Sequence, residues 1–211
     1  MKLETRNIVI SAVALAIVGC SGFSIAHIAS GSSSYFGLCN IIMPALASLG
    51  GIGGSLLMTL FLALKLGSGK LLITKGLPTL AALYSAQAEK PSFSTLLLNV
   101  VLPISMAAAF IVHPVGGAAW VYTLFWVIPV GCEIARHCGA QSLFTRLLAA
   151  TFIAHAVGSV IWLYTVPTSA ATWLGLLAVV PAERLVFASG ATLVAFALKA
   201  LRTAATAHQK A

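Results

Sequence analysis

Long apolar runs without a single charged residue dominate the chain. Residues 7–64, 91–132 and 147–182 contain no Asp, Glu, Lys or Arg. The runs lack the short alternating segments that are typical of a membrane β-barrel. A helix needs about 20 apolar residues to cross a bilayer, and it satisfies its own backbone polar groups there. The pattern therefore predicts membrane-spanning helices.

Polar breaks divide these runs into six predicted spans. The first run breaks at a Gly/Ser-rich loop over 30–37, the second at 113–117 and the third at 167–169. We therefore expect an all-α polytopic membrane protein, with one integral membrane domain over 1–211 and six transmembrane helices. Their expected ranges are 7–28, 41–64, 94–112, 118–136, 146–165 and 182–201.

Two further apolar segments are expected to form short helices. The segment 71–88 carries Lys75 and Pro78, and the sequence leaves open an interfacial helix, a re-entrant helix or a seventh span. The segment 172–180 precedes Pro181, and we expect a short helix at the outer face there.

The composition supports a membrane protein and excludes several other classes. Of the 211 residues, 60% are hydrophobic and 8% are charged, whereas soluble proteins are about 25% charged. So few charges cannot coat a soluble globule, which excludes a soluble enzyme, a disordered chain and a nucleic-acid-binding domain. The net charge of +8 is typical of Lys and Arg held beside anionic lipid.

The positions of the basic residues predict the orientation. With six spans, eleven of the twelve Lys and Arg residues fall on one side of the membrane, and Arg184, which follows Glu183, is the exception. Because loops rich in Lys and Arg stay in the cytoplasm, we expect both termini to be cytoplasmic. A seventh span would break this pattern.

Polar groups at membrane depth are functional candidates because they are costly in a bilayer. In the fifth predicted helix, Thr151, His155, Ser159 and Trp162 recur at helical spacing and share one face. His155 lies near the middle of the membrane in this prediction. It is either a buried histidine bonded to a neighbouring helix or a group that faces a ligand.

Aromatic residues are frequent in the outer half of the predicted bundle. Tyr122 and Trp126 share a face of the fourth helix, with Trp120 at its outer end. Such side chains could line a site for a flat heterocycle through stacking and a few hydrogen bonds. They could equally form a core, and an interfacial aromatic belt explains Trp120.

Candidate polar contacts for a solute flank the predicted outer ends of other helices. His27 and Asn40 flank the first outer loop, while Glu183 and Arg184 begin the last helix. The Glu183–Arg184 pair either contacts a charged end of the solute at the mouth of a pocket, or Glu183 serves as a helix-start residue that complements the helix dipole. Asn99, in the inner part of the third helix, could bond to another helix.

The motifs of soluble chemistry fail on inspection. Gly67-Ser68-Gly69-Lys70 lacks the earlier glycine and the following Ser or Thr of a phosphate-binding loop. Cys132, His137 and Cys138 lie close together in sequence, but there is no second ligand pair for a closed zinc site. We expect no bound metal, no cofactor and no catalytic residues.

On these features the chain resembles the substrate-binding (S) subunits of energy-coupling factor transporters. The shared features are a length near 200 residues, six predicted spans with both ends inside, the basic start with Lys2 and Arg6, and the Ala12-xxx-Ala16 spacing. The chain departs from the cobalt and nickel members, because Lys2 stands where their second residue is His. It carries no signature of any one vitamin subfamily.

The resemblance implies a protein that binds a solute without chemical conversion. It implies a multi-pass location in a bacterial cytoplasmic (inner) membrane and high-affinity capture of a vitamin or related small heterocycle. A transmembrane coupling subunit, which Ala12 and Ala16 would contact, and an ATPase pair would then drive uptake. The solute would contact helices four to six and the first loop, so the candidate site is His27, Asn40, Tyr122, Trp126, His155, Ser159, Trp162, Glu183 and Arg184.

Two other classes remain open. The first is a stand-alone permease or secondary carrier that uses the same outer pocket and needs an inner exit path, for which 71–88 is the candidate segment. It would be favoured by an internal repeat, and none is evident in the sequence. The second is a membrane enzyme that uses His155 or His113 with Glu183 or Glu133.

Overall fold

The structure is a computed structural model, and it describes residues 40–50, 69, 73 and 76–208. The predicted first helix at 7–28, with Ala12, Ala16 and His27, lies outside the described residues. The predicted second helix is described over Asn40–Gly50, which is helical. Within the described ranges the regular structure is helical and contains no strand.

The elements after this segment follow one another with short connections. In chain order they are α4 Leu77–Gln87, α5 Phe93–Leu96, the π-helix η2 Leu97–Val101, α6 Leu102–Val112, α7 Pro114–Ala118, the 3-10 helix η3 Trp120–Trp126, α8 Val127–His137, α9 Leu143–Thr165, α10 Ala170–Gly175 and α11 Val179–His208.

Three helices among the described residues are long and apolar enough to cross a membrane. They are Phe93–Val112, Leu143–Thr165 and Val179–Leu201. These correspond to the spans predicted at 94–112, 146–165 and 182–201, so these three predictions are confirmed as membrane-capable helices. The total of six spans and the cytoplasmic position of both termini stay predictions.

The first of these three helices is continuous but irregular. Ser92 and Thr95 form a reciprocal capping box that starts it. The π-helical turn Leu97–Val101 precedes Pro103, which cannot donate a backbone hydrogen bond and crowds the carbonyl of Asn99. Irregular backbone of this kind is tolerated at membrane depth where it is buried in protein, and Asn99 is fully buried.

The fourth predicted helix, at 118–136, consists of two parts. Residues Trp120–Trp126 form a 3-10 helix and Val127–His137 form α8. Pro129 lies in the first turn of α8, where its missing N–H is tolerated. Gly139 follows the end of α8 with φ of 74°, a left-handed conformation that glycine adopts without strain.

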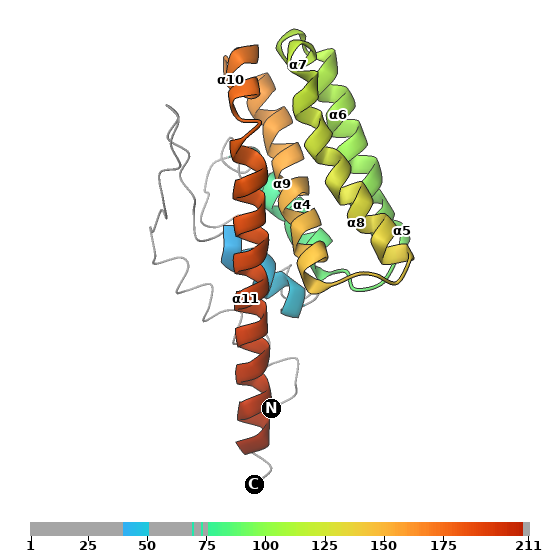
Figure 1. Ribbon diagram of the computed structural model, residues 1–211, viewed down its shortest axis with the longest axis vertical. Coiled ribbons are helices and arrows are strands. Elements are labelled where there is room, and N and C mark those ends of the chain that lie inside the picture. The colour runs from blue at the N-terminus through green and yellow to red at the C-terminus, as the bar shows by residue number, and fades with distance from the viewer. Residues whose placement is uncertain (1–39, 51–68, 70–72, 74–75, 209–211) are drawn as a thin grey trace.

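Helix α9 lies at the centre of the described bundle and contacts α4, α6, α8 and α11 (Figure 1). Two apolar cores surround it. One contains residues of the Asn40–Gly50 segment, α4, α9 and α11, such as Leu46, Leu83, Leu147 and Ala191. The other is aromatic and contains Phe110, Tyr122, Trp126, Phe152 and Trp173.

Small residues bring α4 close to α9. Ala150 is fully buried, and a Cβ atom at Gly158 would lie 3.6 Å from Cγ of Pro78. Ala82, Leu83 and Ala86 are buried in the same core. The described part of 71–88 is therefore a core helix. Its buried residues pack against α9, and the interfacial, re-entrant and spanning placements stay predictions. Residues 70–72 and 74–75 lie outside the described part.

The outer-face segment is confirmed as a short helix, shifted by a few residues. Helix α10 covers Ala170–Gly175 and is followed by a turn, and Trp173 packs into the aromatic core. Helix α11 starts at Val179, three residues before the predicted 182. Pro181 thus lies in its first turn, a position that proline tolerates.

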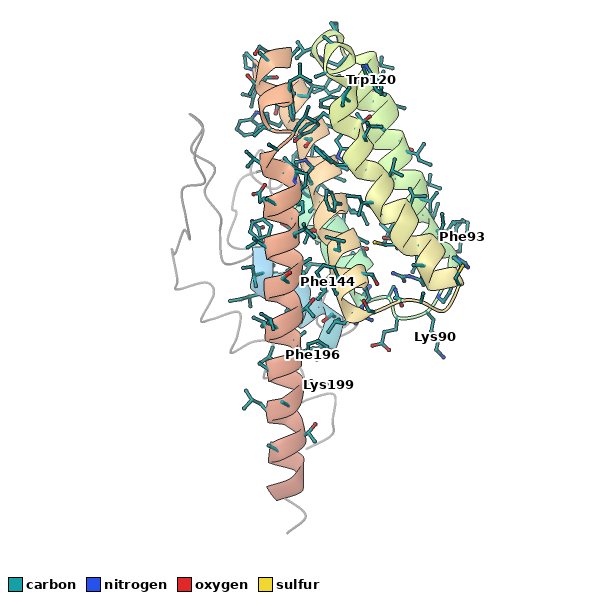
Figure 2. All side chains as sticks on the ribbon, in the orientation of Figure 1. Lys90, Phe93, Trp120, Phe144, Phe196 and Lys199 are labelled. Atoms are coloured by element: carbon teal, nitrogen blue, oxygen red, sulfur yellow. The ribbon has the colours of Figure 1, made fainter. Side chains whose placement is uncertain are left out.

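The two ends of the bundle differ in character. Figure 2 shows Trp120 at the end that carries α7 and α10, and Lys90 and Phe93 at the opposite end. We call these the outer and the inner end, after the predicted orientation. Arg146 pairs with Glu89 and Arg136 donates to the carbonyl of Ala88, so two loops predicted to be cytoplasmic do lie at one end.

Candidate functional site

A polar group lies at the middle of α9, between the two apolar cores. His155 lies twelve residues after the start of α9 and ten before its end. Its Nε2 is 2.8 Å from the hydroxyl of Tyr122, which comes from η3. Ser159, one turn further along α9, lies beside the Tyr122 side chain. One ring nitrogen of His155 is thus held by a group from another helix.

An ion pair from α11 lies beside this group. Nη2 of Arg184 is 2.9 Å from Oε2 of Glu183, and the two side chains are 13% and 15% exposed. Both charges interact with Tyr122, and the charge of Arg184 also interacts with His155. The Arg184 guanidinium lies 4.8 Å from the centre of the Phe187 ring, a cation–π distance.

The place of Glu183 in its helix bears on the helix-start interpretation. It is the fifth residue of α11, and no acidic residue occupies the first turn. The interaction of a carboxylate with the helix dipole falls off within that turn. The contact that the structure gives Glu183 is the pair with Arg184.

Arg184 also lines a small cavity. Its volume is about 30 Å³, and its lining comes from the Asn40–Gly50 segment, α4, α9 and α11. The polar side chains in the lining are those of Asn40, Thr79, Thr151 and Arg184. The structure therefore brings Asn40 and Arg184, which are 144 residues apart in the sequence, to one cavity.

Trp126 lies in the aromatic core next to this polar group. Its ring is 6.2 Å from that of Tyr122 and 5.4 Å from that of Phe110, both edge to face. Its indole Nε1 is buried without an acceptor among the described residues. Trp173 completes the cluster from α10, at 5.0 Å from Tyr122. These contacts place Trp126 within the aromatic core, packed against Tyr122 and Phe110.

Trp162 stands apart from the group although it shares a face of α9 with His155. It is 53% exposed. The backbone carbonyl of Thr151 contacts Arg184, and α11 begins only five residues before Arg184. At 1.5 Å per residue, α11 reaches about 8 Å beyond that level, whereas Trp162 lies about 16 Å along α9. Because the first turn of α11 does not reach the level of Trp162, α11 does not cover that side chain.

The structure thus brings together six predicted site residues: Asn40, Tyr122, His155, Ser159, Glu183 and Arg184. Trp126 packs edge to face against Tyr122 in the aromatic core. Trp162 is exposed and does not contact the group. His27 and the predicted docking residues Ala12 and Ala16 lie outside the described part of the chain.

A second buried polar cluster lies toward the inner end, and it was only partly anticipated. Glu133 of α8 is 1% exposed. Its two carboxylate oxygens accept hydrogen bonds from Thr95 Oγ1 and Asn99 Nδ2, each at 2.7 Å. The side chain of Ser85 donates to Asn99 at 2.7 Å and extends the cluster to α4. The prediction that Asn99 bonds to another helix is confirmed.

Arg136 compensates the charge of Glu133. Its Nε is 3.0 Å from Oε2 of Glu133, and its Nη1 donates to the carbonyl of Ala88. With its amide oriented to satisfy both ends, Gln141 accepts from Arg136 and donates to the carbonyl of Glu89. Arg136, which ends the predicted helix 118–136 among the basic residues expected on the cytoplasmic side, is 3% exposed. The spacing Glu133-xx-Arg136, one helical turn, was the signal for this pair.

No group of three or more His, Cys, Asp or Glu residues is placed to hold a metal ion within the described ranges. Cys132, which is half-buried, and the exposed Cys138 are free thiols. The arrangement around His155 offers hydrogen bonds, one ion pair and aromatic surfaces. These are means of binding a polar solute at membrane depth.

Comparison with known proteins adds no relative from which a function could be transferred. No protein family matches the chain, and neither a characterised protein nor a solved structure is similar to it.

Proposed function

We propose that the chain is the membrane-embedded solute-binding subunit of an uptake transporter. In this proposal the solute is a vitamin or related small heterocycle, bound among Asn40, Tyr122, His155, Ser159, Glu183 and Arg184. The observation that carries the proposal is the group of hydrogen-bonding and charged side chains at the middle of α9.

These side chains cost free energy to bury in a membrane. Polar and charged groups inside a membrane are expensive to bury, and they mark pathways and binding sites. Packing alone does not require such groups, because the buried apolar side chains of the neighbouring core, such as Leu83 and Leu147, contact one another without them. The Tyr122–His155 contact and the Glu183–Arg184 pair therefore support a role in recognition.

The size of the cavity constrains the mechanism. A volume of about 30 Å³ is far below the 300–1,000 Å³ of typical ligand pockets, and in the proposal this arrangement is the closed one. Admission of a heterocycle requires the Asn40–Gly50 segment or α11 to move away from α9. In the proposed mechanism the solute binds from outside, and a coupling subunit with two ATPases then drives its release to the cytoplasm.

Association with partners tests the coupling part of the proposal. Tagged full-length protein, purified mildly from the membranes of its native cells, should bring down a transmembrane subunit and an ATPase pair. The variant Ala12→Trp should abolish that association and leave solute binding intact. Unchanged association of Ala12→Trp would contradict the docking assignment. Purification without any ATPase would contradict the coupled mechanism.

A stand-alone carrier is the second candidate, and one observation favours it. The inner cluster of Ser85, Asn99 and Glu133 places polar groups below the proposed site, where a carrier would need an exit path. Uptake by the purified chain alone in liposomes would support the carrier. Uptake that depends on the coupling subunit and ATP would support the binding subunit.

A further inference from the structure

Arg184 has hydrogen-bonding capacity that its neighbours among the described residues do not use. Its Nη2 contacts Glu183 at 2.9 Å, and Nη1 reaches the carbonyl of Thr151 only at 3.5 Å. Its Nε is buried and has no acceptor among the described residues. A guanidinium stays charged in proteins and carries five N–H donors. A buried donor without a partner is costly, so an acceptor is expected beside Arg184.

The cavity next to Arg184 has room for one small polar group. About 10–15 Å³ is needed for one water molecule, so the volume of about 30 Å³ admits two waters or a group of similar size, such as a carboxylate. It cannot admit a heterocycle. The rest of a solute that places one group here would have to lie outside the cavity.

The charge of the lining selects the kind of group. Among the described residues of the lining, Arg184 is the charged side chain, and the polar side chains of Asn40, Thr79 and Thr151 are neutral. Glu183 pairs with Arg184 but does not line the cavity. A group that enters therefore meets the positive partner of the pair. Carboxylates form the strong, charge-assisted hydrogen bonds that a guanidinium provides.

We propose that the solute carries a carboxylate, which enters this cavity and binds to Arg184. The amide of Asn40, which also lines the cavity, supplies a second, neutral donor. This inference rests on the proposed function, because it names the chemical class of the solute for the same site. It adds that Arg184 recognises the acidic end, while the aromatic and imidazole side chains contact the remainder.

The smallest carboxylate tests the site directly. Thermal unfolding of the full-length protein in lipid nanodiscs is measured against sodium formate at constant total sodium, with chloride as the exchanged anion. Formamide, a neutral molecule of nearly the same shape, serves as the matched probe. We expect formate to raise the unfolding temperature by a few degrees in a saturable manner, with an apparent Kd in the millimolar range, and formamide to have no effect.

Two arginine variants make the test specific. Arg184→Gln should reduce the formate response at least fivefold, and Arg184→Lys, which keeps the charge, serves if the first variant fails to fold. The matched control is Arg146→Gln. Arg146 is also buried with an unpartnered Nε among the described residues, but it lies at the inner end and outside this cavity. Arg146→Gln should retain the full response.

The inference would be overturned if both Arg184 variants kept the formate response of the wild-type protein. It would also be overturned if formamide stabilised the wild-type protein as much as formate does, or if the wild-type protein did not respond to formate. The failures of the two proposals are distinguishable. A bound solute that lacks an acidic group overturns this inference and leaves the binding function standing. A formate response in a protein that never captures a solute overturns the proposed function alone.

Discussion

The hydroxyl of Tyr122 and Nε2 of His155 lie 2.8 Å apart, although the two residues are 33 positions apart in the sequence. This contact joins η3 to the middle of α9 and anchors the proposed site. Tyr122 is 1% exposed, and its ring stacks on Phe110 at 5.6 Å. The ring therefore packs in the aromatic core, while the hydroxyl contacts His155 in the polar group.

Removal of this hydroxyl should separate the two roles. Tyr122→Phe keeps the ring but leaves Nε2 of His155 without this partner, so we expect a loss of stability of about 1–3 kcal/mol. Solute retention should fall by tenfold or more. The matched control is Tyr164→Phe, because the exposed Tyr164 donates to the carbonyl of Ala109 away from the site. Equal solute retention in the two variants, measured by equilibrium binding, would count against the site.

A close backbone approach at the outer end predicts a sharp difference between two glycines. A Cβ atom at Gly116 would overlap the carbonyl oxygen of Phe110 and lie 3.0 Å from Cδ2 of Leu163, whereas a Cβ at Gly131 has open space around it. Gly116→Ala should therefore strongly destabilise the protein. Gly131→Ala should be neutral or stabilising by up to about 1 kcal/mol, because alanine favours a helix. Thermal unfolding in detergent checks both variants, and equal midpoints would contradict the packing described.

The buried inner cluster should respond strongly to the loss of one charge. Glu133→Gln leaves Arg136 buried without its carboxylate partner, a change that typically costs about 3–5 kcal/mol. The double variant Glu133→Gln with Arg136→Met should recover part of that loss. For comparison, Glu89→Gln removes a carboxylate that is 74% exposed from its pair with Arg146, and such pairs contribute about 0–1 kcal/mol. Unfolding midpoints that rank these variants otherwise would contradict the pairing.

The four tryptophans should divide into two classes in a lipid bilayer. Trp120 and Trp162 are 52% and 53% exposed, whereas Trp126 and Trp173 are 2% and 3% exposed. In single-tryptophan variants reconstituted with brominated phospholipids, fluorescence of the first two should be quenched and that of the last two preserved. Protection of Trp162 from quenching would return it to the solute site.

The apolar pattern predicted the long helices well because a span is a composition signal over some 20 residues. The helix expected at 94–112 runs from Phe93 to Val112, and the one expected at 146–165 ends at Thr165 as predicted. Helix starts were harder to place. The capping box of Ser142 and Thr145 starts α9 three residues before the predicted position, through local polar contacts that the apolar pattern does not register.

The candidate site depended on pairings across helices, which helical spacing alone cannot supply. Spacing placed His155 and Ser159 on one face, and the structure adds that Tyr122 meets them there. Spacing put Trp162 on that face too, but the start of α11 at Val179 decides how far the face is covered. The burial of Arg136 was missed, because its counter-ion Glu133 has to be recognised as buried before the arginine can be.

The most direct test of the central claim is mass spectrometry of small molecules released from mildly purified full-length protein. The account predicts a heterocyclic solute at one molecule per chain in the wild-type protein. The solute should also be retained by the control His113→Ala, whose histidine caps α7 at the outer end, and it should be lost from a folded His155→Ala variant. An empty wild-type protein under conditions that exclude loss in detergent, or equal retention by both variants, would contradict the account.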